Sequence, residues 1–213
     1  MQQKLVMRPT RFAPHRLRTV RMLVAAGAVS LISTSASAHV GTGLSGGWVS
    51  GFTHPFGGLD HLLAMVSVGL WGAVLGRPLI YVLPVVFPGM MVAGAIMGMF
   101  VVPLPPVEAG IALSVLALGG CVALSLRAPV WVASVLVAAF AVFHGYAHGK
   151  ELPSAADPAG YSAGFVLSTG LLHVSGICIG LLNSRPNGVL VTRGVGGVIA
   201  ALGAWFVFQA IGT

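Results

Sequence analysis

The sequence has 213 residues, of which 56% are hydrophobic and only 7% are charged, and its mean hydropathy is +0.95. Soluble domains carry about a quarter of their residues as charged side chains, so this composition excludes an ordinary soluble enzyme or binding module. The formal net charge of +7 does not indicate nucleic-acid binding, because six of the eleven Lys and Arg residues lie within the first 21 positions. We therefore expect an integral membrane protein.

The first 38 residues have the pattern of a secretory signal peptide. A basic segment precedes the apolar run 22–32, and the small residues Ala36-Ser37-Ala38 follow it, which is the order that signal peptidase recognises. The apolar run is shorter than the roughly 20 residues that cross a bilayer. We predict cleavage after Ala38, with an uncleaved anchor as the alternative, and a mature chain of residues 39–213.

Cleavage there would make His39 the first residue of the mature chain. An N-terminal His can chelate a divalent metal through its α-amine and its imidazole together. The alternative interpretation is that His39 merely follows the cleavage site and binds nothing.

Six further apolar runs follow, each of a length suited to crossing the hydrocarbon layer. They cover residues 59–76, 79–102, 107–126, 129–148, 161–183 and 194–212. The runs are apolar on all sides, whereas strands of a membrane barrel alternate polar and apolar residues, and helices satisfy their own backbone groups in lipid. The prediction is an all-α membrane protein, a bundle of six transmembrane helices that forms one domain after the signal peptide.

The positive charges give the orientation of these helices. A cleaved signal peptide leaves the mature N-terminus outside the cytoplasm, and six spans then place only Lys150 outside. The four remaining basic residues fall on the cytoplasmic side, as the positive-inside rule requires; they are Arg77, Arg127, Arg185 and Arg193. We predict a multi-pass protein of the bacterial cytoplasmic membrane with both mature termini in the periplasm.

On this topology the acidic residues and nearly all histidines of the mature chain fall at or beyond the periplasmic ends of helices. The residues in question are His54, Asp60, His61, Glu108, His144, His148, Glu151 and Asp157. The exception is His173, which lies near the middle of the fifth span. Ionisable groups at membrane depth are costly and usually face a partner, the protein interior or a water-filled path.

The spacing of these residues favours a metal site. His144 and His148 are separated by four positions, so both imidazoles can lie on one helix face, and Glu151 follows one turn later. Imidazoles with a few carboxylates suit Ni²⁺, Co²⁺, Zn²⁺ or Cu²⁺, whereas Mg²⁺ and Ca²⁺ prefer oxygen ligands alone. Two simpler interpretations stay open: the histidine pair arises by chance, and Asp60 caps a helix N-terminus.

Two motifs resemble those of the HupE/UreJ family of nickel and cobalt permeases. His54-Pro-Phe-Gly-Gly-Leu-Asp60-His61 is similar to the family signature HPxxGxDH, and Phe143-His-Gly-Tyr-Ala-His148-Gly-Lys-Glu151 is similar to FHGxAHGxE. The signal peptide and the six spans also match this family. The resemblance implies uptake of Ni²⁺, with Co²⁺ as the alternative ion, and a functional link to hydrogenase or urease maturation. It also implies that His54, Asp60 and His61 form a first metal-handling group, and that His144, His148 and Glu151 form a second.

Three residues are weaker candidates for the same path. Glu108 matches an acidic position of the family, His173 is the candidate relay within the membrane, and His39 is the candidate for capture at the mature N-terminus. We expect no tightly bound cofactor and no catalytic residue. No GxxxxGK[ST] sequence occurs, which argues against ATP hydrolysis by this chain. The alternatives are a membrane-embedded metal- or haem-binding protein, either an enzyme or an electron-transfer subunit, and a structural subunit of a larger complex.

Overall fold

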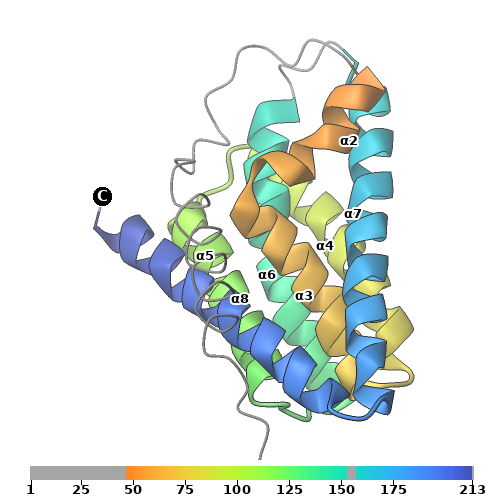
Figure 1. The fold of residues 1–213 in the computed structure, drawn as a ribbon. Helices are drawn as coiled ribbons and strands as arrows, with labels where there is room; N and C mark the ends of the chain where they lie inside the picture. Colours follow the sequence, from red (N-terminus) through yellow and green to blue (C-terminus); the bar gives the residue numbers. More distant parts are fainter. Residues whose placement is uncertain (1–46, 153–156, 213) are drawn as a thin grey trace, which may run out of the picture. The chain divides into compact units, whose positions relative to one another are not determined.

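The computed structural model describes residues 47–152 and 157–212. The described residues form helices and no strand, so the predicted all-α class is confirmed. The predicted signal peptide and His39 lie outside the described residues. In chain order the helices are α2 (Gly47–Gly57), α3 (Leu59–Leu75), α4 (Leu79–Met99), α5 (Val107–Ala123), α6 (Val130–Glu151), α7 (Pro158–Gly180), the short 3₁₀ helix η2 (Leu181–Ser184) and α8 (Gly188–Ile211), as Figure 1 shows.

Each of the six predicted ranges overlaps one of the helices α3 to α8, although α6 ends three residues later than predicted, and α7 and α8 begin three and six residues earlier. Four helical segments among the described residues are long enough and apolar enough to cross a membrane: α4, α6, α7 with η2, and α8. The helices α3 and α5 have only 17 residues each, and α3 passes the same test only together with α2, which meets it at 85°. The protein is therefore a multi-pass helical membrane protein, and helix length supports four spans in its described part, or five if α2 and α3 form one.

The helix α3 lies at the centre of the bundle. It contacts α4, α5, α7 and α8, and nine of its 17 residues are buried. A short helix that other helices surround does not need to match the thickness of the hydrocarbon layer along its own length, because it meets protein rather than lipid. The largest fully buried side chains come mainly from α3, α4 and α5, and include Met65, Leu70, Trp71, Leu83, Phe87, Ile111 and Leu118.

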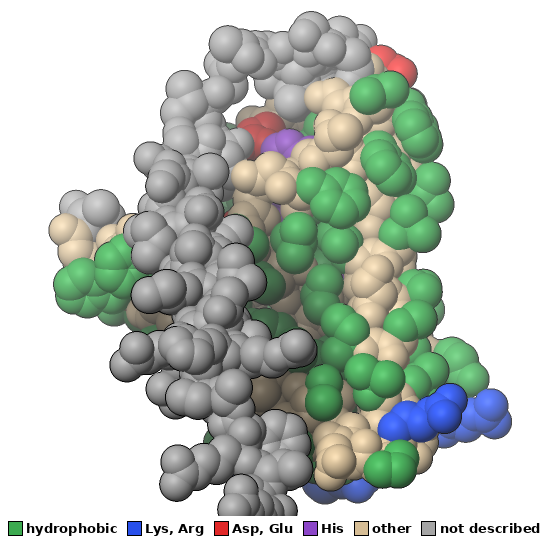
Figure 2. Space-filling view, in the orientation of Figure 1, with side chains coloured by type: hydrophobic (Ala, Val, Ile, Leu, Met, Phe, Trp, Pro, Cys, Tyr) green, Lys and Arg blue, Asp and Glu red, His purple; other side chains and the backbone are tan. Residues whose placement is uncertain are grey.

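The outer surface of the helices is apolar, in contrast to a soluble protein. Val85, Trp131, Leu190 and Phe208 each expose about 70% of their surface or more. In water such side chains would form an aggregation-prone patch, whereas in a bilayer they meet lipid chains at no cost. Figure 2 shows apolar side chains along most of the visible helical surface, with Lys and Arg at one end and Asp, Glu and His at the other.

Glycines allow α4 and α6 to pack with their backbones in contact. A Cβ atom at Gly94 or Gly98 of α4 would collide with the backbone of α6, and a Cβ atom at Gly145 or Gly149 of α6 would collide with the backbone of α4. Small residues four positions apart are typical of close helix pairs in membranes. The two helices are therefore held in one register, which fixes the position of every side chain on the adjacent face of α6.

Candidate metal path

The first motif contains a sharp break between two helices. α2 carries His54 and ends two residues after Pro55, which lacks a backbone N–H for the helix ladder. Gly58 then has an extended backbone and α3 starts at Leu59, with the two helix axes at 85°. Sequence analysis did not predict α2, because its segment is rich in glycine and short. The sharp break lets His54 and His61, which lie on different helices, both contact the ring of His148.

Asp60 does not cap α3, so the capping interpretation is wrong. The N-cap position is Gly58, and no side chain caps the helix there. Asp60 instead lies in the first turn, where its Oδ1 accepts a hydrogen bond from the backbone N–H of His61 at 2.7 Å and lies 2.9 Å from the ring nitrogen Nδ1 of His61. A carboxylate that accepts from one ring nitrogen orients the imidazole and raises its basicity as a metal ligand at the other nitrogen.

The second motif places two imidazoles on the inner face of α6. His144 and His148 are one helical turn apart and expose 0% and 6% of their surface. The glycine after each of them, Gly145 and Gly149, contacts the backbone of α4. The motif thus alternates a candidate ligand with a packing glycine, and the glycines position the histidines.

Three side chains form a group at the partly exposed end of this arrangement, which we call the outer site: His54 of α2, and His148 and Glu151 of α6. One ligand atom from each lies within 4.8 Å of the others. His54 Nε2 is 3.7 Å from Glu151 Oε2, and the two side chains are 15% and 24% exposed. Two imidazoles and a carboxylate at this separation can close on one divalent ion with small side-chain movements.

Two further imidazoles form a buried group, which we call the inner pair: His61 of α3 and His144 of α6. Their ring centroids are 4.7 Å apart. His148 joins the outer site to the inner pair, because its ring lies 4.9 Å from that of His54 and 4.8 Å from that of His61. Four imidazoles from both motifs therefore form a continuous chain of ring contacts that leads from the partly exposed His54 to the fully buried His144.

The chain of rings continues past the inner pair through an apolar residue. Phe87 of α4 is fully buried, and its ring centroid is 5.6 Å from that of His144 and 5.4 Å from that of His173 on α7. His173 is itself 1% exposed. The structure thus places His173 beyond the four-imidazole chain, and separates the two by one aromatic ring.

A backbone carbonyl is the polar group that lies toward His173. Neither of its ring nitrogens makes a hydrogen bond with a described residue, and the carbonyl of Pro84 lies toward the ring. That carbonyl has lost its normal helical partner, since the residue four positions later is Pro88, which has no N–H. His173 is therefore suited to weak polar contact rather than to a strong ligand set.

The structure does not bring every predicted residue into this site. Glu108 lies in the first turn of α5 and is exposed, and it belongs to neither the outer site nor the inner pair. Asp157 caps α7, where its Oδ1 accepts from the N–H of Gly160 at 2.9 Å. Sequence analysis missed Ser114 and Phe87, because a single serine or phenylalanine inside an apolar helix carries no signal of its own.

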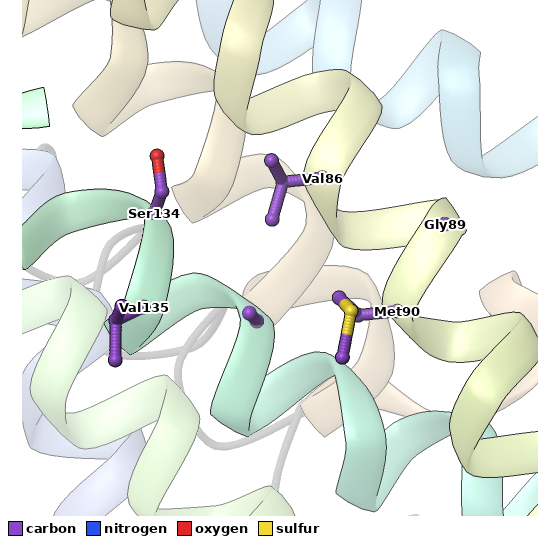
Figure 3. A pocket seen from close by; sticks show the side chains of 6 residues that line it. Val86, Gly89, Met90, Ser134 and Val135 are labelled. Carbon is purple, nitrogen blue, oxygen red and sulfur yellow. The ribbon is translucent and has the colours of Figure 1, made fainter. Parts of the chain in front are cut away.

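One hollow in the described part of the molecule meets the site, and a larger one lies away from it. A hollow of about 90 Å³ lies between α4, α6 and α7, and its walls include His148, Tyr161 and Phe165. A larger groove of about 310 Å³ lies on the surface between α4 and α6, where Val86, Gly89 and Met90 face Ser134 and Val135 (Figure 3). That groove contains no imidazole or carboxylate, and its apolar walls suit a lipid chain.

Comparison with known proteins supports the resemblance seen in the motifs. The sequence profile of the family described as HupE / UreJ protein matches residues 27–206. Protein HupE of Rhizobium leguminosarum bv. viciae is 43% identical over 169 residues, which cover 79% of this chain and 88% of that protein. No solved structure is significantly similar to this chain.

Proposed function

The chain belongs to the HupE / UreJ family, and from that premise we propose that it carries a divalent transition-metal ion, Ni²⁺ in preference to Co²⁺, across the cytoplasmic membrane into the cell. The ion is the transported substrate. The chain is not an enzyme in this proposal, and its task in the cell is to supply nickel for hydrogenase or urease assembly.

The observation that supports this function best is the chain of imidazole contacts from His54 through His148 and His61 to His144. Exposure falls along it, from 15% at the His54 side chain to 0% at His144. A hydrated ion at one end can exchange its water for protein nitrogen and oxygen donors in steps, so that no single step removes all of the hydration. The outer site and the inner pair each bind the ion weakly enough to release it again, as conduction requires.

The carboxylates fit this sequence of steps. Glu151 stands at the more exposed end, where a negative charge attracts a divalent cation. Asp60 is itself half-buried and stands behind the buried ring of His61. The donor set contains no thiolate, because Cys121 and Cys178 belong to neither group. Nitrogen and carboxylate donors without sulfur suit Ni²⁺ and Co²⁺ and do not suit Cu⁺.

The haem-binding alternative fits the geometry less well. The rings of His61 and His144 lie on facing helices, but their centroids are 4.7 Å apart and the planes meet at 83°. Rings in edge-to-face contact leave no layer for a porphyrin between them. The metal content of the purified protein distinguishes transport from the alternative of an intramembrane metalloenzyme. An enzyme retains its metal during purification, whereas a transport site loses it to mild chelation.

The direct test of the function is uptake of radioactive nickel by cells that express the chain. We expect uptake above that of cells with empty vector, with cobalt a stronger competitor than zinc or copper. A strain that makes the protein at normal level in its membrane and takes up no more nickel than the empty-vector strain would contradict the proposal.

We place the outer site on the periplasmic side, with Arg77 and Arg185 on the cytoplasmic side and six spans after a cleaved signal peptide. The test uses a variant without Cys121 and Cys178 and with one new cysteine, either at Ser154 in the α6–α7 connection or at Ser184 beside Arg185. An impermeant maleimide should label position 154 in intact spheroplasts, and position 184 only after lysis. The reverse pattern would overturn this orientation, and mass spectrometry that finds residues 1–38 still attached would overturn the cleavage.

A further inference from the structure

A buried serine outside both motifs contacts the inner pair. Ser114 lies in the middle of α5 and is 0% exposed, as is His144. Its Oγ is 2.6 Å from the backbone carbonyl oxygen of Ile111, one turn earlier in the same helix, and 2.9 Å from Nε2 of His144. The hydroxyl therefore stands between a carbonyl and an imidazole nitrogen.

The direction of these two hydrogen bonds follows from the number of hydrogens. A carbonyl oxygen can only accept, and two oxygens 2.6 Å apart with no hydrogen between them would repel each other, so the hydroxyl of Ser114 donates to Ile111. A serine hydroxyl has only one hydrogen, and in Ser114 that hydrogen is donated to the carbonyl of Ile111. Toward His144 the Ser114 oxygen must then accept, so Nε2 of His144 carries the proton.

This assignment decides which atom of His144 can bind an ion. A neutral imidazole has one protonated nitrogen and one lone pair, so the lone pair of His144 is on Nδ1. That nitrogen is buried and makes no hydrogen bond with the described residues. In His61 the carboxylate of Asp60 fixes the opposite tautomer, because its Oδ1 accepts from Nδ1 and leaves the lone pair on Nε2.

On the basis of the proposed transport function, we propose that Ser114 is a positioning residue: it holds His144 in the tautomer whose Nδ1 lone pair faces the transported ion as a ligand. The inner pair then offers Nε2 of His61 and Nδ1 of His144. A carboxylate fixes one ring and a neutral hydroxyl, itself anchored on the backbone of α5, fixes the other.

If Ser114 had only a structural role, its loss would have the same effect as the loss of any other buried hydroxyl of the bundle. Ser168 of α7 is also 0% exposed and donates to the carbonyl of the residue three positions earlier, Phe165, at 3.0 Å. Ser168 makes no hydrogen bond with an imidazole among the described residues, so Ser168→Ala is the matched control for loss of a buried hydroxyl. The conservative variant Ser114→Thr keeps the hydroxyl and tests rescue.

The first measurement is the nitrogen spectrum of purified, metal-free protein labelled with ¹⁵N-histidine, in which the His144 signals are assigned from their loss in His144→Gln. In the parent and in Ser168→Ala we expect Nε2 protonated and Nδ1 unprotonated. Ser114→Ala should convert these signals to a mixture of tautomers, and Ser114→Thr should restore them. A His144 protonated at Nδ1 in the parent, or unchanged signals in Ser114→Ala, overturns the proposal.

The second measurement is the concentration dependence of nickel uptake. Ser114→Ala should lower the maximal uptake rate by about 10-fold, near the lower end of the effect of losing an outer-shell partner of a metal ligand, while Ser168→Ala leaves the maximal rate unchanged and Ser114→Thr restores it. An equal change of the maximal rate in Ser114→Ala and Ser168→Ala overturns the proposal. If the parent itself transports no nickel, the proposed function fails, and the nitrogen spectrum still decides the tautomer.

Discussion

The outer site and the inner pair both contain imidazole side chains, but the surroundings of these side chains differ. At the outer site His54 and Glu151 keep 15% and 24% of their side chains exposed, and their closest ligand atoms are 3.7 Å apart. In the inner pair both rings are almost completely buried, and each has a hydrogen-bonded partner, Asp60 for His61 and Ser114 for His144. The outer site is thus open and loosely arranged, and the inner pair is closed and oriented.

The difference indicates how the task is divided between the two groups. An exposed carboxylate acts on the ion before it has lost its water, and solvent and salt screen that attraction. Buried imidazoles act after water has been lost, and there the orientation of each lone pair decides whether binding offsets the cost of dehydration. We therefore expect changes at the outer site to alter capture, and changes at the inner pair to alter the transport step itself.

The largest effect is expected where the two groups meet. His148 belongs to the outer site and contacts His61, so His148→Ala removes a ligand from one group and a neighbour from the other. Nickel uptake should fall by more than the roughly 10- to 100-fold cost of losing an outer-shell partner, at unchanged protein level. The control is Lys150→Ala, two residues further along the same helix. Parental uptake by a normally expressed His148→Ala protein would show that the path does not pass between the groups.

The next prediction concerns the inner pair alone. Asp60→Asn keeps the size of the side chain and removes the charge that orients His61, so the maximal uptake rate should fall by about 10-fold, a typical cost for losing a carboxylate behind a ligating histidine. KM should change less than the maximal rate. Initial rates over a range of nickel concentrations separate the two parameters. A change confined to KM would place Asp60 with the outer site and remove the distinction.

A third prediction disturbs both groups equally. Gly145 contacts the backbone of α4 at Met91, so Gly145→Ala must move α6 and with it both His144 and His148. Overpacking of this kind destabilises a protein by about 1–3 kcal/mol, which should lower the temperature at which the detergent-purified protein unfolds. Gly197→Ala of α8 is the matched control, because a Cβ atom there meets nothing within 4 Å. Equal melting temperatures for the two variants would contradict the close packing of α4 and α6.

The smallest effect is expected at the exposed end. Glu151→Gln removes the charge of the outer site and keeps its shape, so KM should rise a few-fold with the maximal rate near that of the parent. The difference from the parent should shrink as ionic strength is raised, since salt screens an exposed charge. An effect on the maximal rate that is insensitive to salt would assign Glu151 to the transport step, together with Asp60.

The sequence alone predicted six of the helices and the residues of both motifs. Long runs that are apolar on all sides can only be helices in lipid, and all six predicted ranges overlap a helix. The pairing of His144 with His148 follows from the periodicity of one helix, which is a local property. The convergence of the two motifs followed from alternating helix directions, which place segments some 90 residues apart at the same end of the bundle.

Other properties were decided only by the tertiary structure. The 85° break at Gly58, the exposed position of Glu108 and the burial of His144 depend on which helices pack against each other. The same is true of the contact between Ser114 and His144, which joins two residues 30 positions apart on different helices. Hydropathy and periodicity are properties of a single segment. They do not predict which hydrogen bond a side chain makes with another helix. That bond decides which nitrogen of His144 has the lone pair.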